Sequence, residues 1–228
     1  SYLVVPPLLL ILFFPILKDH AHLIRNLYDT TRVTKRLVVI AIVLGVALFG
    51  ISVASNVAMS AYEISIRDNS PLGIGLASSW SCTNVWYLIL GIAISALLIP
   101  VIEEVINRGF LLNYFMPRGK WLAILLSSLL FALFHKPQTI VLAFLFGIFL
   151  AHLTLNSGSL LPATIAHSIH NLLVQFDSGC LTLTWLSSNT LPDVVRHGRL
   201  AALSCFLLFC LATILVSRKV TGTRTVPL

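Results

Sequence analysis

Long apolar segments are the feature that most constrains this chain. Of its 228 residues, 57% are hydrophobic and 10% are charged, and the mean hydropathy is +0.96. A soluble domain carries about 25% charged residues, so this composition suits a surface that faces lipid. A spanning helix needs about 20 mostly apolar residues. The sequence therefore predicts an all-α, polytopic membrane helical bundle with about seven transmembrane helices, near residues 2–17, 37–61, 86–115, 121–135, 139–155, 159–176 and 199–217.

Three motifs place polar side chains inside these apolar segments. They are Glu103-Glu104-x-x-x-Arg108, Phe131-x-x-x-His135 and His167-x-x-x-Asn171. An ionised side chain at the bilayer centre costs about 2.5 to 3.5 kcal/mol on insertion scales, so such groups predict a functional site. Counting about 1.5 Å per residue from the nearest loops places all three motifs about 12 to 21 Å deep. We therefore expect three helices to converge on one polar pocket, with Phe131 and Phe134 as its apolar walls.

The first motif contains an expected ion pair and a second carboxylate. Glu104 and Arg108 are four residues apart with the acid first, which is the favourable order for a helical pair. Glu103 is rotated by about 100° and should face a different neighbour, across a helix interface. A buried latch between helices is the simpler reading of one Glu/Arg pair. One guanidinium cannot compensate two adjacent carboxylates, however, and this favours a functional role for Glu103.

The other two motifs supply imidazoles and an amide. Phe131 and His135 share one helix face, as do His167 and Asn171. His170 lies about 60° from His167 and is expected to be an interface residue rather than part of the site. A carboxylate with an imidazole can hold and deprotonate water, while imidazole and amide N–H groups can stabilise an oxyanion. These are the two requirements of amide hydrolysis.

In this order, the three motifs resemble the signature of the CAAX-protease and bacteriocin-processing family of intramembrane peptidases. The resemblance covers about 85–176, which is the expected catalytic core of a single integral-membrane domain spanning 1–228. It implies that Glu103 and His135 activate water and that His167 and Asn171 form the oxyanion site. Arg108 pairs with Glu104 to organise the helix, and Phe131 supports the site. The resemblance also implies a glutamic-type peptidase without a cofactor or metal.

The resemblance further implies the partners. A protein or peptide substrate would be cleaved near its C-terminus, as a prenylated or sorting-signal tail, within membrane lipid. Three alternatives stay open. One is a non-catalytic immunity or scaffold protein of the same fold, and another is a zinc-dependent intramembrane protease that uses the same His and Glu side chains. The third, an ion-coupled transporter, should show internal repeats and broken helices, and the sequence has neither.

Basic residues in the loops predict the orientation. Alternate loops carry ten Lys and Arg residues on one side and four on the other. The basic side is normally cytoplasmic, so the C-terminus is expected in the cytoplasm and the pocket in the outer half of the bilayer. Topology thus accounts for the net charge of +7, and we expect no nucleic-acid partner. Cys82 and Cys180 fall in outer loops, where either free thiols or a disulfide is possible.

Overall fold

All regular structure in the described part of the chain is helical. The structure is a computed structural model that describes residues 26–66 and 85–176, together with 203, 207 and 210. The elements are η1 (Thr30–Arg32), α3 (Lys35–Ile66), α4 (Val85–Gly91), η2 (Ile92–Leu98), α5 (Ile99–Glu104), η3 (Val105–Leu111), α6 (Leu112–Phe115), η4 (Met116–Arg118), α7 (Lys120–Leu133), η5 (Pro137–Thr139), α8 (Ile140–Ser157) and α9 (Leu161–Phe176).

Five of the predicted segments correspond to helical stretches in the structure. Segment 37–61 is α3, 86–115 is the run from α4 to α6, and the next three are α7, α8 and α9. The outer segments 2–17 and 199–217 lie outside the described residues, apart from three isolated positions, and so do Cys82 and Cys180.

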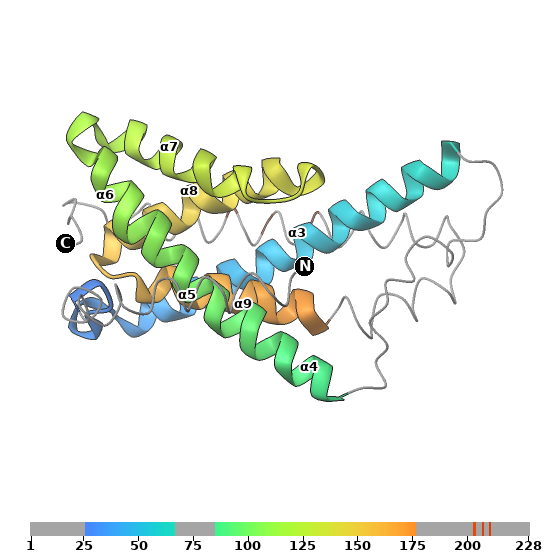
Figure 1. Cartoon of the computed structure of the whole chain (residues 1–228), viewed down its shortest axis with the longest axis horizontal. Coiled ribbons are helices and arrows are strands. Elements are labelled where there is room, and N and C mark those ends of the chain that lie inside the picture. Colours follow the sequence, from blue (N-terminus) through green and yellow to red (C-terminus); the bar gives the residue numbers. More distant parts are fainter. Residues whose placement is uncertain (1–25, 67–84, 177–202, 204–206, 208–209, 211–228) are drawn as a thin grey trace.

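The run from α4 to α6 is one continuous helical rod, as Figure 1 shows. Two π-helical stretches, η2 and η3, interrupt its α-helical hydrogen bonding on either side of Glu103 and Glu104. In a π-helix each N–H bonds to the carbonyl five residues back, and such stretches are frequent at functional sites. These two stretches were not predicted from the sequence.

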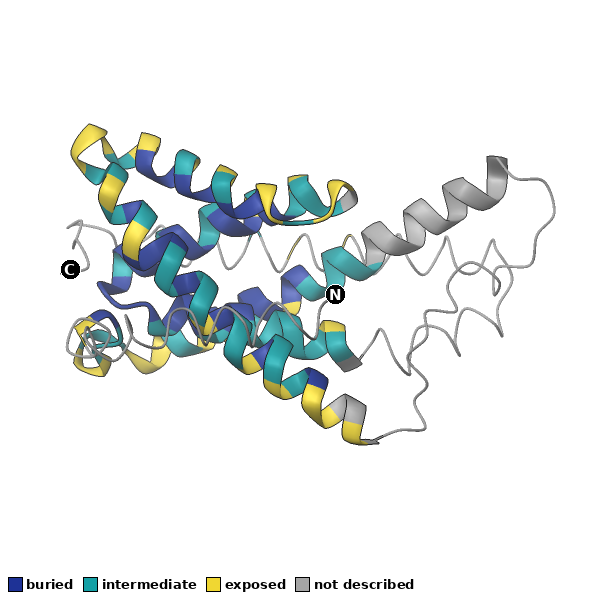
Figure 2. Cartoon of the chain, in the orientation of Figure 1, coloured by how far each residue is buried: buried dark blue, intermediate teal, exposed yellow. Residues whose placement is uncertain are grey.

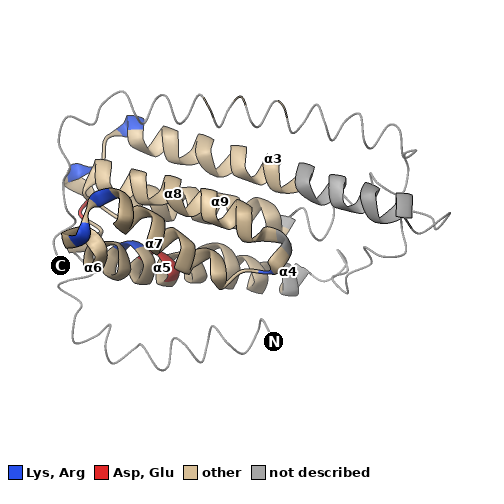
Figure 3. Cartoon of the chain, turned by 90° about the horizontal axis from the view of Figure 1, so that it is seen from above, with Lys and Arg blue, Asp and Glu red and all other residues tan. Residues whose placement is uncertain are grey.

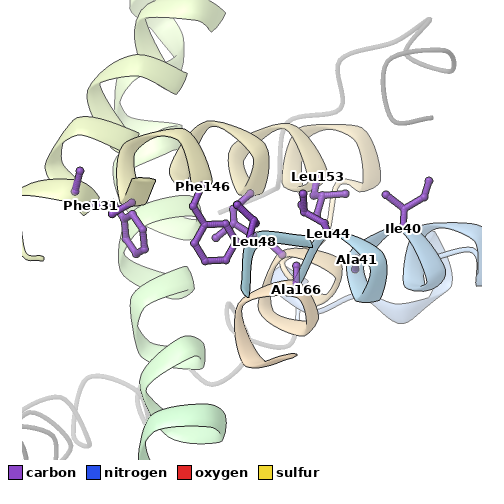
Figure 4. Packing of buried hydrophobic residues seen from close by; sticks show 12 residues of the cluster. Ile40, Ala41, Leu44, Leu48, Phe131, Phe146, Leu153 and Ala166 are labelled. Atoms are coloured by element: carbon purple, nitrogen blue, oxygen red, sulfur yellow. The ribbon is translucent and has the colours of Figure 1, made fainter. Parts of the chain in front are cut away.

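Helix α8 is the most enclosed of the long helices. Half of its residues are buried, compared with 33% of an 18-residue stretch within Lys35–Val53 and 22% of one within Ile89–Arg118. It packs against α7 on one side and α9 on another, and α9 in turn lies along α3 (Figure 1). Figure 4 shows the core where these helices meet, with Leu44 and Leu48 of α3 beside Phe146 and Leu153 of α8.

Helix α7 is apolar on its outer face as well as its inner face. Trp121, Leu125, Leu129 and Leu133 recur every four residues and are 44% to 65% exposed. Figure 2 shows this pattern as exposed turns along the outer side of α7 and buried turns facing α8. Large apolar side chains in such a continuous outer stripe are expected where a helix faces lipid.

Three of the described helical stretches are long and apolar enough to cross a membrane. They are Lys35–Val53, Ile89–Arg118 and Ile140–Ser157. Helix α7 has 14 residues, or about 21 Å, and is short for a hydrocarbon core of about 30 Å.

Most of the described basic residues gather at one end of the helices (Figure 3). This end contains the start of α3, the turn from α6 to α7 and the turn from α8 to α9. Backbone and side-chain bonds tie the first of these to the third: Leu160 N–H donates to Leu27 O at 2.8 Å, and Arg32 donates to Gly158 O at 3.4 Å. The sequence assigned these loops to one side of the membrane, and the grouping of the described loops agrees with that assignment.

The turn before α3 is held by local polar contacts. Asp29 accepts hydrogen bonds from the hydroxyl and backbone N–H of Thr31, and these bonds, helped by Arg32, lower the pKa of the Asp29 carboxyl. Tyr28 lies 3.0 Å from the Thr164 hydroxyl of α9, and burial raises the pKa of this phenol. These contacts anchor the first turn of α9, the helix that carries His167.

Candidate active site

Glu104 lies at the centre of the polar side chains that the three motifs supply. Its side chain is fully buried, and its Oε1 atom accepts from two partners: Arg108 Nη1 at 3.2 Å, and His167 Nδ1 at 2.9 Å. The first contact confirms the predicted i, i+4 ion pair. The second was not predicted, because it joins α5 to α9 across 63 positions of sequence. Glu104 thus holds a guanidinium and an imidazole in fixed positions.

Arg108 is equally enclosed and has contacts beyond the ion pair. Its Nη2 donates to Gly147 O of α8 at 3.2 Å, and its guanidinium carbon lies 4.5 Å from the centre of the Phe131 ring. Gly147 also permits the close packing of α7 on α8, since a Cβ there would lie 2.9 Å from Ser128 Cβ of α7. Arg108 therefore links α7 and α8 to the helical rod.

Glu103 differs from its neighbour in both exposure and contacts. Its side chain is 33% exposed, and its Oε2 lies 3.6 Å from Nε2 of His167. This separation is beyond a normal hydrogen bond. The expectation that Glu103 faces a partner across a helix interface is confirmed, and that partner is the opposite edge of the imidazole that Glu104 holds.

Phe131 lies between the three motifs. Its ring centre is 4.6 Å from that of His135 and 5.7 Å from that of His167, and its carbonyl oxygen is 2.9 Å from His135 Nδ1. A carbonyl only accepts, so Nδ1 of His135 carries the hydrogen and, in the neutral ring, Nε2 keeps a free lone pair. The four-residue spacing of Phe131 and His135 thus fixes both the position and the tautomer of the imidazole.

Asn171 is anchored to the helical rod. Its Nδ2 donates to the backbone carbonyl of Ser95 at 2.8 Å. Together with His135 and His167, it lines a cavity of about 200 Å³ bounded by α3, α8 and α9. Glu103 does not line this cavity, but its Oε2 lies 3.6 Å from Nε2 of His167, which does.

Two expectations about neighbouring residues need revision. Phe134 is 84% exposed, so it does not form a wall of the site. It is the residue that caps the end of α7, where its side chain turns outward. Phe146 of α8 takes that place, with its ring 5.2 Å from His167. His170, which was expected to be an interface residue, also lines the cavity.

The described side chains can support acid–base chemistry within an apolar setting. Two carboxylates, one guanidinium, two imidazoles and an amide come from α5, η3, the residues just after α7, and α9, and the rings of Phe131 and Phe146 pack against them. Within the described ranges, no three His, Cys, Asp or Glu side chains are grouped so that they could hold a metal ion.

Replacing Arg108 with alanine should unfold the protein as well as inactivate it. The change leaves Glu104 buried without its guanidinium, and breaking such a pair costs about 3 to 5 kcal/mol. The measurement is the melting temperature of the purified protein in detergent. Arg118→Ala is the matched control, because Arg118 is exposed and its loss should change stability by less than about 0.5 kcal/mol. An Arg108→Ala protein that melts like the wild type would show that the pair does not stabilise the fold.

A family comparison bears on these residues. Residues 84–173 match the family model described as Type II CAAX prenyl endopeptidase Rce1-like, and this span contains all three motifs. No match is found among curated proteins or among solved structures. Residues 84–173 are therefore similar to the CAAX-protease family, which confirms the resemblance that the order and spacing of the motifs indicated.

Proposed function

We propose that this protein is an intramembrane endopeptidase of the glutamic type. It hydrolyses a peptide bond near the C-terminus of a membrane-associated or lipid-modified protein. The observation that carries the proposal is the geometry around His167, which Glu104 holds at one edge while Glu103 faces the other edge at 3.6 Å. The family match supports the same class of reaction.

Glu103 and His135 are assigned to the activation of water. Glu103 is the more accessible of the two carboxylates, and within the described residues no ion pair joins it to a guanidinium. His135 donates from Nδ1 to Phe131 O, so its Nε2 can accept a proton or a hydrogen bond. A positioned carboxylate or imidazole of this kind typically accelerates a proton transfer by about 10² to 10⁴.

His167 and Asn171 are assigned to the oxyanion. Because Nδ1 of His167 donates to Glu104, the ring can donate to an oxyanion only from Nε2, as the imidazolium. Two carboxylates and one guanidinium leave one negative charge in the layer, and an imidazolium balances it. Asn171 uses one amide hydrogen on Ser95 O and has a second to donate.

These assignments give a complete hydrolysis. The oxygen of a water molecule attacks the carbonyl carbon of the substrate while Glu103, assisted by His135, takes one proton from the water. The carbonyl oxygen becomes an oxyanion that His167 and Asn171 stabilise. The C–N bond then breaks as the leaving nitrogen receives that proton, which gives a carboxylic acid and a free amine. The remaining acid proton passes to the amine, so that the products are a carboxylate and an ammonium.

Replacing Glu103 with glutamine should abolish cleavage without lowering stability. The proposed task of this carboxylate is to activate water, and its contact with His167 is long, at 3.6 Å. The measurements are turnover of a tail-peptide panel and the melting temperature. Retention of more than about a tenth of wild-type turnover would overturn the assignment, since the loss of a general base costs about 10² to 10⁴ in rate.

Glu104→Gln provides the matched control at the adjacent position. It weakens contacts to Arg108 and His167 together, so it should lower the melting temperature as well as the activity. A non-catalytic immunity or scaffold protein would give no cleavage in the wild type either. The pair of variants therefore separates chemistry from folding.

Cleavage should persist after exhaustive treatment with chelators. The proposed mechanism activates water through carboxylate and imidazole alone, so it needs no Lewis acid. Turnover before and after chelation, with elemental analysis of the active protein, measures this directly. Loss of activity that added zinc restores would instead make Glu103, His135 and His167 metal ligands.

The proposed substrate side follows from the position of the cavity. Thr139, at the turn between α7 and α8, contributes to its lining, and this turn lies opposite the basic end of the helices (Figures 1 and 3). If the basic end is cytoplasmic, the cavity opens outward. That orientation favours the C-terminal tail of an exported protein over a cytosolic prenylated protein.

Labelling of single cysteines should establish this orientation. Pro117 and Pro137 are matched sites, because both are exposed and both lie in short 3₁₀ turns at opposite ends of α7. In a variant lacking the four native cysteines, a membrane-impermeant maleimide should label Pro137→Cys in intact cells, and should label Pro117→Cys only after permeabilisation. The reverse pattern would place the cavity on the cytoplasmic side.

A further inference from the structure

The hydrogen bond from Asn171 to Ser95 uses a backbone carbonyl inside a helix, so it requires that this carbonyl has no backbone donor. In an α-helix, the carbonyl of residue i normally accepts from the N–H of residue i+4. Ser95 lies inside the rod, far from either end, yet its carbonyl accepts the Asn171 amide from α9 at 2.8 Å. This contact therefore requires a local departure from α-helical bonding.

The departure comes from η2 and from Pro100 together. Ile99, the residue that would normally donate to Ser95 O, donates instead to Ile94 O, five residues back. In the same π register, the next donor to Ser95 O would be residue 100. That residue is proline, which has no N–H. One backbone donor is thus used elsewhere and the other does not exist, so Ser95 O is left for Asn171.

We propose that Pro100 is a positioning residue for the Asn171 amide. This inference rests on the proposed function, in which Asn171 donates to the oxyanion. Because a carbonyl can only accept, the bond to Ser95 O fixes which end of the amide is the NH₂ group. The second N–H of Asn171 and its Oδ1 are then held in a single orientation at the cavity that His135 and His167 also line.

The position of Pro100 links this anchor to the first motif. Pro100 is buried and is the second residue of the α-helical stretch α5, which ends at Glu104. The same proline that frees the Ser95 carbonyl therefore lies one turn before the two carboxylates. One helical rod therefore carries both Ser95, the anchor of the oxyanion donor, and Glu103, the water-activating group.

A double-mutant cycle of melting temperatures tests the proposed role of Pro100 without any substrate. Asn171→Ala in the wild type leaves the Ser95 carbonyl without its donor and should lower the melting temperature by roughly 2 to 10 °C. Pro100→Ala supplies a backbone N–H to this segment, so Asn171→Ala in that background should cost much less. Additive shifts for the two substitutions would overturn the proposal.

Kinetics of the same variants test the consequence for the reaction. Removing one oxyanion donor typically lowers kcat by about 10² to 10³. Asn171→Ala should fall in this range. Pro100→Ala should lower kcat at least tenfold with little change in KM, and the double variant should be no slower than Asn171→Ala. Val101→Ala, on the exposed face of α5, is the matched control and should retain wild-type kcat.

The outcomes separate this inference from the proposed function. If Glu103→Gln abolishes cleavage while Pro100→Ala cleaves like the wild type, the positioning role is wrong and the proposed function stands. If the wild type cleaves nothing, the proposed function fails, and the melting cycle still decides whether Pro100 controls the bond between Ser95 and Asn171.

Discussion

The buried carboxylate of Glu104 is the interaction on which the site depends. It is enclosed by apolar helices, where an uncompensated charge is expensive, and it binds Arg108 and His167 through a single oxygen. Those two partners come from one turn further along the rod and from α9, and Arg108 reaches α8 as well. The charge of Glu104 therefore links the helical rod to α9 directly and to α8 through Arg108.

The division of labour between the adjacent glutamates follows from this arrangement. Glu104 makes the structural contacts, to Arg108 and His167. Glu103 is partly exposed and lies opposite the other edge of the His167 ring. Phe131 separates the polar groups from one another, since its ring contacts Arg108, His135 and His167. Its carbonyl also fixes His135. Aromatic and backbone contacts of one residue thus hold side chains from all three motifs in place.

The sequence predicted the parts of this structure that depend on local spacing. Apolar segment lengths gave the helices, and the four-residue interval gave the pair of Glu104 and Arg108. It did not predict that Glu104 also holds His167, or that Phe146 rather than Phe134 lies beside that ring, because these contacts depend on how separate helices dock. The π-helical stretch at Ser95 was equally hidden, since it arises from a shift in backbone register. Pro100 was its only visible signal.

The central claim is that water, activated by Glu103, attacks the substrate directly. A single turnover in ¹⁸O-labelled water, followed by mass spectrometry of both product and protein, tests this most directly. The account predicts one ¹⁸O atom in the new C-terminal carboxylate of the product and none in the peptide that contains Glu103. Label in the Glu103 side chain would show that the carboxylate attacks the substrate itself and forms an anhydride, which would contradict the proposed mechanism.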